Sequence, residues 1–475
     1  MEKSQEISAE SSGTFRDTPG TIEVSGKRKW VFAKKPKGKL FNLRTWIAWS
    51  LLAIFFLLPF VKFNGQPFLL LNVLERKFIL FGVIFWPQDF MIFGLGMLTF
   101  MVFIVLFTIA YGRIFCGWVC PQTIFMESVF RRIEYWIDGD AEAQKKLAQR
   151  EWDKVKIYKR VLKHGIFFLI SFVIANTFLS YIIGADAVIH IASQPVSEHI
   201  GGFTAILVFT GVFFGVYSWF RDQVCIIVCP YGRLQGVLVD RNTVAVSYDY
   251  VRGEPRGKRE RGELNTGKGD CVDCSLCVKV CPTGIDIRNG AQLECIGCTA
   301  CIDACDSVMT KLKRPTNLIR YASENEIKEG RKFTWTPRLK AYTVVLSLLV
   351  GVLVTLLVTR TDVDATVLRA GGQLFQERDA THISNLYTVK VINKTRDDLP
   401  ITFRIENGDG TIEMVGKPLS VGKESKSETT FFIVRDREKI VERKTRIVIG
   451  VWSGDRKLQT VKTTFLGPVF TAQNN

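Results

Sequence analysis

The sequence lacks the motifs that mark most nucleotide-binding proteins. Neither a glycine-rich phosphate loop nor a Rossmann fingerprint occurs among its 475 residues, so the chain is not expected to bind a nucleotide. The first 25 residues are polar and have no apolar core, and a signal peptide is therefore not expected. Lys and Arg are absent from residues 184–200, and cysteine is absent from residue 359 onward. These two absences help to predict which side of a membrane each part of the chain faces.

Apolar and basic residues are abundant instead. Hydrophobic residues make up 47% of the chain, and the formal net charge is +17. Such a charge can indicate nucleic-acid binding, but in a membrane protein it is more typical of a Lys/Arg-rich cytoplasmic face. We therefore expect no nucleic-acid partner. The 12 cysteines are an even number, which is compatible with disulfides, so their spacing has to decide between disulfides and metal ligation.

Five apolar stretches are long enough to cross a bilayer. Each is nearly free of charge and is bounded by basic residues. One such stretch alone could be a buried helix of a large soluble protein, but five together predict an α-helical polytopic membrane protein. They lie at residues 45–61, 91–111, 165–183, 201–219 and 341–358.

The basic residues between these stretches predict the orientation. Residues 1–44 hold ten Lys or Arg and residues 112–163 hold eleven, whereas residues 62–90 hold three. The positive-inside rule therefore places the N-terminus, the second connection and residues 220–340 in the cytoplasm, and the fifth span carries the C-terminal part outside. All 12 cysteines then lie on the reducing side or at its membrane boundary, which favours metal ligation over disulfides.

Eight cysteines between the fourth and fifth stretches form two runs of C-x2-C-x2-C-x3-C, the spacing of bacterial two-cluster ferredoxins. In that arrangement the first three cysteines of a run bind one [4Fe–4S] cluster and the fourth binds the other. We therefore predict one cluster on Cys271, Cys274, Cys277 and Cys305, and a second on Cys281, Cys295, Cys298 and Cys301. Structural zinc is the alternative, but zinc-binding cysteines usually occur as pairs separated by longer spacers. Pro282 follows the first run and Asp306 the second, so the local turn and the cluster potential are expected to differ.

The remaining cysteines form two C-x3-C-P motifs, Cys116 with Cys120 and Cys225 with Cys229, each at the inner end of a span. On a helix, positions i and i+4 share a face, so each pair is predicted to present two sulfurs to one ligand. The following proline would end or kink the helix. Four converging thiolates would suit Cu(I) or another thiophilic species, or would act as a dithiol redox relay. The alternative is that these cysteines are small apolar packing residues.

Several polar residues near the spans are expected to have structural roles. His164, His190 and His199 are interpreted as interfacial or capping residues, with copper entry at His190 and His199 as the weaker alternative. Asp89 is likewise interpreted as interfacial. The charged stretch 252–261 is predicted to be a solvated linker, or else a docking site for anionic headgroups or an acidic electron donor.

The remaining segments have clear patterns. Residues 360–475 alternate apolar and polar side chains between turns, which predicts a small antiparallel β-sandwich. Because residues 360–475 contain no cysteine, this part is interpreted as an interaction or stabilising module. The region around the predicted clusters is expected to be mostly loop and turn, with Gly284 and Gly290 as turn residues.

Together these features resemble the FixG-like accessory proteins of cbb3-type cytochrome oxidase, also called CcoG or RdxA. The resemblance rests on the five spans, the two C-x3-C-P motifs, the stretch Arg252-Gly-Glu-Pro-Arg-Gly-Lys258, the two-cluster insert and the immunoglobulin-like exported sandwich. NapH-like and NosR-like membrane iron–sulfur proteins also have the duplicated C-x3-C-P spans, so those motifs alone are less specific. The resemblance implies reduction of Cu(II) to Cu(I) to supply copper to the oxidase. It also implies that the redox or copper site is formed by Cys116, Cys120, Cys225 and Cys229.

The working hypothesis is a cupric reductase of the bacterial inner membrane, which takes electrons from a cytosolic donor. Its expected cofactors are two [4Fe–4S] clusters, with a copper ion at the paired cysteines, and its expected partners are the bilayer, oxidase assembly components and a second copy of the chain. Two rivals remain open: a quinol- or quinone-linked electron-transfer subunit, and a non-catalytic oxidase assembly factor. The predicted order is an N-terminal cytoplasmic segment, a four-helix membrane region, a ferredoxin-like domain, a fifth membrane helix and an immunoglobulin-like domain, at residues 1–44, 45–240, 241–338, 339–359 and 360–475.

Overall fold

The structure is a computed structural model that describes residues 28–468 except 64, 74–76, 87–88, 258–266, 332–333, 396 and 424. The chain divides into two compact units, Met1–Gly351 and Val352–Asn475. The first unit contains the long helices and the cysteine-rich region. The second is built from β-strands around a core of its own.

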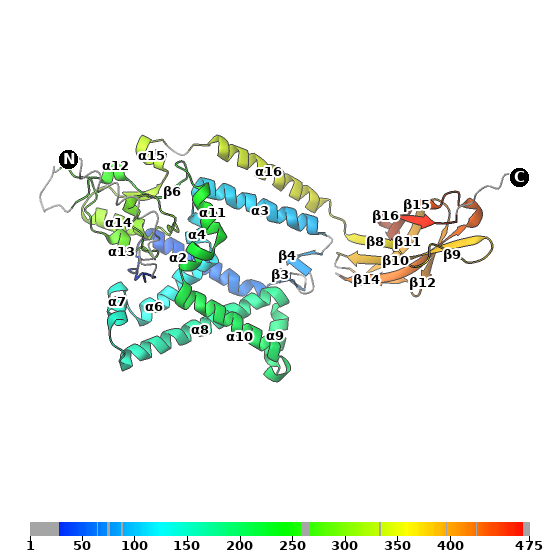
Figure 1. Ribbon diagram of the computed structural model, residues 1–475, viewed down its shortest axis with the longest axis horizontal. Helices are drawn as coiled ribbons and strands as arrows, with labels where there is room; N and C mark the ends of the chain where they lie inside the picture. Colours follow the sequence, from blue (N-terminus) through cyan, green and yellow to red (C-terminus); the bar gives the residue numbers. More distant parts are fainter. Residues whose placement is uncertain are drawn as a thin grey trace. The chain divides into compact units, whose positions relative to one another are not determined.

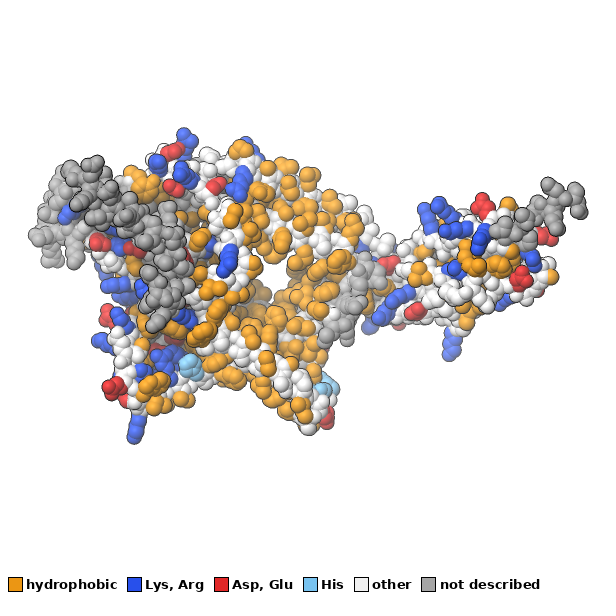
Figure 2. Space-filling view, in the orientation of Figure 1, with side chains coloured by type: hydrophobic (Ala, Val, Ile, Leu, Met, Phe, Trp, Pro, Cys, Tyr) orange, Lys and Arg blue, Asp and Glu red, His pale blue; other side chains and the backbone are white. Residues whose placement is uncertain are grey.

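Five helices of the described chain are long and apolar enough to cross a membrane, as predicted. Hydrophobic side chains cover the middle of the helical unit, and Lys and Arg gather where α7 (Ala141–Gln149) lies (Figures 1 and 2). Helices that expose apolar side chains in this way are stable in lipid rather than in water. The spans are α2 with η1 (Lys39–Phe60), α3 (Phe90–Tyr111), α8 (Lys154–Ile183), α10 with η5 (Ile200–Phe220) and α16 (Pro337–Val358).

The packing of the spans centres on aromatic side chains. Helices α8 and α10 lie side by side (Figure 1). Phe130 stacks on Tyr217 of η5 with 4.3 Å between ring centroids and meets Phe167 of α8 edge-on at 4.8 Å. Phe130 ends the π-helical turn η3 (Phe125–Phe130), so the chain that follows the first cysteine pair is built into the core of the bundle.

The connections between the spans also contain regular structure. Between α2 and α3 lie the strands β1 (Lys62–Phe63), β2 (Gln66–Pro67), β3 (Leu69–Asn72), β4 (Lys77–Leu80) and β5 (Val83–Phe85), which pair antiparallel as β1–β2 and β3–β4–β5. The short helices of the other connections are α4 (Ile114–Trp118), α5 (Pro121–Ile124), α6 (Arg131–Ile137), α9 (Ala185–Ser193), η4 (Val196–Glu198), η6 (Val224–Val228) and α11 (Pro230–Leu238).

The cysteine-rich region is held together by a two-stranded antiparallel sheet of β6 (Ala245–Tyr248) and β7 (Ile319–Ala322). Loops and turns predominate as predicted, and Gly284 and Gly290 have φ of 73° and 97°, which confirms them as turn residues. The helices of this region are α12 (Tyr250–Gly253), α13 (Leu276–Lys279), η7 (Ile287–Asn289), α14 (Ala300–Lys311) and α15 (Glu324–Glu329).

One contact fixes this region to the first span. The carboxylate of Asp303, on α14, accepts hydrogen bonds from the backbone N–H groups of Leu40 and Phe41 at 3.2 and 2.7 Å. These are N–H groups of the first turn of α2, which have no partner inside that helix. Asp303 therefore caps a membrane helix from within the second cysteine run.

The second unit is the predicted antiparallel sandwich. One sheet has the order β12–β14–β10–β8, with β9 pairing β10, and the other has the order β13–β11–β15–β16. Val389, Phe431, Ile449 and Phe465 are fully buried between the sheets. The strands are β8 (Val363–Arg369), β9 (Gln376–Glu377), β10 (His382–Asn393), β11 (Leu399–Asn407), β12 (Thr411–Val415), β13 (Leu419–Val421), β14 (Lys426–Asp436), β15 (Lys444–Ser453) and β16 (Arg456–Leu466), with a short helix η8 (Arg437–Lys439).

Candidate functional site

The structure brings the eight cysteines of the two runs together in two adjacent groups. One pocket is lined by Cys271, Cys274, Cys277 and Cys305, beside Tyr248 of β6. In this first group Cys274 is exposed, whereas Cys271 and Cys277 are buried. The first group is therefore the one that reaches the surface of the cysteine-rich region.

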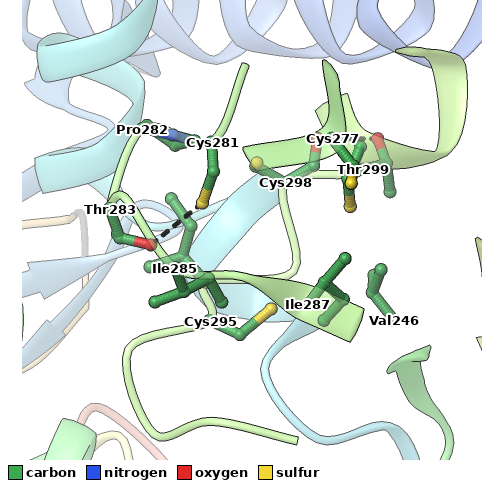
Figure 3. Close-up of a pocket in the computed structure, with 12 residues that line it drawn as sticks. Val246, Cys277, Cys281, Pro282, Thr283, Ile285, Ile287, Cys295, Cys298 and Thr299 are labelled. Carbon is green, nitrogen blue, oxygen red and sulfur yellow. Dashed lines mark hydrogen bonds between the residues drawn. The ribbon is translucent and has the colours of Figure 1, made fainter. Parts of the chain in front are cut away.

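A second pocket is lined by Cys281, Cys295, Cys298 and Cys301. Figure 3 shows the sulfurs of Cys281, Cys295 and Cys298 facing a common space. Cys277 also borders this pocket, so the two groups are neighbours. None of the four cysteines of the second group is exposed. The grouping is the one that the ferredoxin spacing predicts.

The two loops that carry these cysteines have the same backbone shape. Asp273 and Gly297, each just before the second cysteine of a run, have φ of 51° and 67°. Ser275 and Thr299, each just after it, have φ of 54° and 65°. Left-handed conformations are unfavourable for residues other than glycine, and they persist where the surroundings impose them. Both loops therefore wrap around an enclosed space in the same way.

These groups fit a cluster better than a single ion. No three Cys, His, Asp or Glu side chains of the described chain converge closely enough to hold one metal ion. Tetrahedral zinc would draw four sulfurs to about 3.8 Å from one another, given a Zn–S distance of about 2.3 Å. Burial raises the pKa of Cys298 to about 11 and of Cys295 to about 12. Such thiols lose their protons when positively charged iron compensates the thiolate charge.

The stretch that begins at Arg252 supports the first group. Its backbone pairs with the chain before Cys271: Gly253 O accepts from Cys271 N at 3.4 Å, and Gly257 N donates to Cys271 O at 3.1 Å. Arg252 Nε donates to Asp270 Oδ2 at 2.8 Å. The prediction of a solvated linker is therefore wrong for Arg252, because its guanidinium and backbone are bound to the first cysteine loop. The rest of that stretch from residue 258 lies outside the described residues.

Contrary to the prediction, the two cysteines of each pair do not lie on one face of a helix. Cys116 lies in α4 and Cys225 in the π-helical turn η6, but Cys120 and Cys229 are extended, with ψ of 124° and 112°. The reason is the proline that follows each of them, because its ring disfavours the helical conformation at the preceding residue. Each proline then begins a new helix, α5 or α11, instead of kinking the old one.

The two cysteine pairs nevertheless occupy one buried neighbourhood. Burial, together with the nearby groups Cys120, Asp222, Cys116 and Cys229, raises the pKa of Cys225 to about 12. Gln235 of α11 donates from Nε2 to Cys116 Sγ at 3.4 Å and is itself fully buried. Gln235 was not predicted as a site residue, because no motif in the sequence marks it.

The first cysteine pair touches the second group of the cysteine-rich region. A Cβ at Gly117 would lie 2.5 Å from Ile296 O and 2.9 Å from the carbonyl of Gly297, so only glycine fits there. Trp118 Nε1 donates to Gly297 O at 3.3 Å. Cys116 packs into the same apolar cluster as Ile296 and Cys298. The C-x3-C-P motif and the loop of the second group are therefore in direct contact.

A buried ionic network lies beside the second pair. Arg131 Nε is 2.9 Å from Glu127 Oε1, and Arg221 Nη2 is 2.5 Å from Glu134 Oε2. Lys163 also contacts Glu134, at 3.7 Å. Burial alone would raise the pKa of Glu134, but Arg221 and Lys163 outweigh it and lower the pKa below its ordinary value. The network ties α6 and α8 to the turn before Cys225.

The remaining predicted residues have structural positions. His199 is the N-cap residue of α10, and Asp89 is the N-cap residue of α3. His164 packs on the ring of Phe214. Among the described residues, no group of three ligand side chains joins a histidine to the cysteines. The side chains of His199 and Asp89 make no capping hydrogen bond within the described chain, so the interfacial interpretation of these residues stays a prediction.

Comparison with known proteins agrees with this architecture. Three family sequence models match parts of this chain. Residues 220–324 match a 4Fe-4S dicluster domain, residues 93–139 match a 4Fe-4S binding domain, and residues 353–468 match the IG-like fold at the C-terminus of FixG. The segment 93–139 contains Cys116 and Cys120 and no other cysteine.

Three curated proteins are similar over long stretches. RdxB of Cereibacter sphaeroides is 34% identical over 86% of this chain and 89% of its own. RdxA of the same organism is 33% identical over 80% and 83%, and the nitrogen fixation protein FixG of Rhizobium meliloti is 34% identical over 62% and 58%. A FixG-related crystal structure from Vibrio parahaemolyticus matches 22% of this chain and 97% of its own, at 23% identity and a TM-score of 0.19. The chain belongs to the FixG/Rdx family of membrane-associated iron–sulfur oxidoreductases.

Proposed function

We propose that this chain transfers electrons from a cytoplasmic donor to Cu(II) and releases Cu(I) for the assembly of a cbb3-type cytochrome oxidase. When bound, each [4Fe–4S] cluster stores one electron, and each Cu(II) takes up one. The proposed ligands of the two clusters are Cys271, Cys274, Cys277 and Cys305, and Cys281, Cys295, Cys298 and Cys301. The proposed site for the copper substrate comprises Cys116, Cys120, Cys225 and Cys229, which would bind the ion in pairs because no three of them converge on one point in the described chain.

The cysteine-rich region is proposed to face the cytoplasm of the inner membrane, and the β-sandwich the periplasm. Support comes from the two ends of the spans α8 and α10. The connection at one end, residues 112–163, holds eleven Lys or Arg, and the connection at the other end, residues 184–200, holds none. Under the positive-inside rule the basic end is cytoplasmic.

The observation that carries the proposal is the contact of Gly117 with the loop of Ile296 and Gly297. Because Cys116 and Cys298 share one apolar cluster, an electron passes from the second group to the paired thiols without crossing water. Cys274 is the exposed cysteine of the first group and offers the entry point for a donor.

The chemistry of the paired thiols suits the reduced ion. Thiolates are soft ligands that bind Cu(I) in preference to Cu(II), so they favour the reduction thermodynamically. Since burial raises the pKa of Cys225 to about 12, its thiol is protonated at neutral pH and loses the proton on binding copper. The walls of the pocket at Cys225 include Glu127 and Asp222, and both carboxylates pair with Arg131.

Cysteine substitution tests the role of the pairs. The protein is reduced with dithionite under anaerobic conditions, desalted so that no dithionite reduces copper directly, and mixed with Cu(II) and a Cu(I)-specific chromophore. The variants C116S/C120S and C225S/C229S are expected to lose Cu(I) formation while keeping cluster absorbance. Ile227→Ser is the control, because it places the same hydroxyl in η6 and keeps every thiol. Full Cu(I) formation by both double variants would remove the pairs from the route.

Iron analysis separates copper binding from another use of the same thiols. The proposal predicts the same iron content per chain in the wild type and in both double variants. A loss of iron from either variant would mean that the four thiols hold a cluster of their own, and the copper assignment would then be wrong.

A further inference from the structure

A pocket separate from the paired cysteines lies where α3 meets the cysteine-rich region. Its walls come from the turn after α3 (Tyr111 to Ile114), from the end of α11 at Gln235 and Gly236, and from the cysteine loop at Leu293 and Cys295. Its cavity has a volume of about 220 Å³. Because drug-sized ligands occupy pockets of about 300–1,000 Å³, this cavity suits a single ring and not a larger cofactor.

The pocket reaches both the membrane boundary and a proposed cluster ligand. Tyr111 is the last residue of the membrane span α3 and is 45% exposed. Cys295 and Gly297, at the other side of the pocket, belong to the loop of the second cysteine group. A molecule in the pocket is therefore in contact with lipid-facing chain on one side and with Cys295 on the other.

The side chains of the pocket suit a neutral ring that carries a few hydrogen-bonding groups. Ile114, Val239 and Val246 give it apolar walls. The guanidinium of Arg113 donates an N–H to Gly232 O at 2.7 Å and has further N–H groups to donate. The hydroxyl of Tyr321 accepts from Trp118 Nε1 at 3.1 Å and donates to Gly297 O at 3.3 Å.

We propose that this pocket binds the head group of a membrane quinone or quinol. The chain has no phosphate-binding loop for a flavin or nicotinamide nucleotide, and the pocket opens at the end of a membrane helix. A lipid-soluble redox ring meets both conditions, and its carbonyl oxygens would accept hydrogen bonds from Arg113. A bound quinol that is oxidised to quinone loses two electrons and two protons, one electron for each cluster, and the protons leave through the open mouth of the pocket. The inference goes beyond copper reduction, because it adds a lipid-side electron carrier.

Photolabelling of the full-length protein tests the site. The oxidised, copper-free protein in detergent is irradiated with a short-chain azidoquinone, with and without excess unlabelled quinone, and the labelled peptides are identified by mass spectrometry. We expect label that the unlabelled quinone displaces, within residues 111–114, 235–246 or 291–297. Label that is confined to other parts of the chain, or that is not displaced, would overturn the proposal.

A substitution at the mouth of the pocket gives a second measure. Ala291 is an exposed loop residue of the pocket wall, and Ala291→Phe is expected to weaken quinone binding by about tenfold or more through steric exclusion. Ala143→Phe, at an exposed position of α7, is the matched control. Equal binding by the two variants would contradict the assignment.

Copper reduction is measured on the same protein preparation, so that the quinone site and the copper reduction are tested independently of each other. Specific labelling without Cu(I) formation would remove the copper proposal and keep the quinone site. Cu(I) formation without specific labelling would remove the quinone site and keep the copper proposal.

Discussion

At the scale of single residues, Gly117 occupies a position with no room for a side chain. It stands between the two thiols of the first pair, and its missing side chain lets the loop of Ile296 and Gly297 approach the motif. The atoms that a Cβ would meet belong to the backbone of a cysteine loop, so they cannot rotate away as the end of a side chain can. The contact therefore tolerates no larger residue without a shift of the loop.

We predict that Gly117→Ala slows Cu(I) formation and destabilises the protein by about 1–3 kcal/mol, the usual cost of overpacking. The measurements are the rate of Cu(I) formation and thermal unfolding in detergent. The control is Gly211→Ala on α10, where a Cβ would meet nothing within 4 Å. If Gly117→Ala behaves as Gly211→Ala does, the contact is not needed.

The two groups of cysteines could be predicted from sequence because the spacing within each run is local. Each run of four cysteines lies within eleven residues, so the grouping follows from known loop geometry. Gln235 could not be found in this way, since its hydrogen bond to Cys116 joins residues 119 positions apart. The same holds for Asp303, whose capping of α2 depends on how the cysteine-rich region docks on the first span.

At the scale of elements, the membrane helices followed from long apolar stretches, but the segments around the cysteine pairs did not. Helical geometry was predicted through each pair, whereas the cysteine before each proline is extended, and the second pair begins in a π-helical turn. The effect of proline on the residue before it is local and was available from the sequence. The π-helical turns depend on packing between helices, as the stacking of Phe130 on Tyr217 illustrates.

The cap of α2 gives a prediction at this scale. Asp303→Ala removes the acceptor for two N–H groups of the first turn of α2, and we expect a loss of about 1 kcal/mol, within the ~0.5–2 kcal/mol usual for a lost cap. Iron should also be released faster to a chelator, because α14 carries cysteines of both groups. Thr310→Ala, which removes an exposed hydroxyl from the same helix, is the control. Equal iron release from the two variants would show that the cap does not hold the cluster region.

At the scale of the whole molecule, the buried ionic network gives the helical unit an acid-sensitive element. Arg221 and Lys163 hold the pKa of Glu134 below its ordinary value. A carboxyl group with a lowered pKa in the folded state contributes stability above its unfolded pKa of about 4.3, and this contribution is lost as pH falls through the folded pKa.

We therefore predict that Glu134→Gln lowers stability at pH 7 by about 3–5 kcal/mol, because it leaves buried cations without their partner. It should also reduce the loss of stability of the wild type below about pH 4.3. Thermal unfolding in detergent across this pH range measures both effects. Glu151→Gln, at an exposed position, is the control. The same acid dependence in all three proteins would contradict this role of Glu134.

We expect the second unit to fold independently of the first. Its buried core residues, among them Val389 and Phe431, all lie within residues 363–465. We expect residues 360–475, expressed alone, to give a β-type circular dichroism spectrum and one cooperative thermal transition, without bound iron. A chain that stays unfolded would show that the sandwich depends on the rest of the protein.

Electron transfer from the cysteine-bound clusters to copper is the step on which the proposed function depends. The most direct measurement mixes the anaerobically reduced, desalted protein with Cu(II) and a Cu(I)-specific chromophore, and records cluster absorbance and Cu(I) together over time. The account predicts that the clusters reoxidise with the same time course as Cu(I) appears, one Cu(I) for each electron lost. Clusters that stay reduced while Cu(II) is present would contradict it.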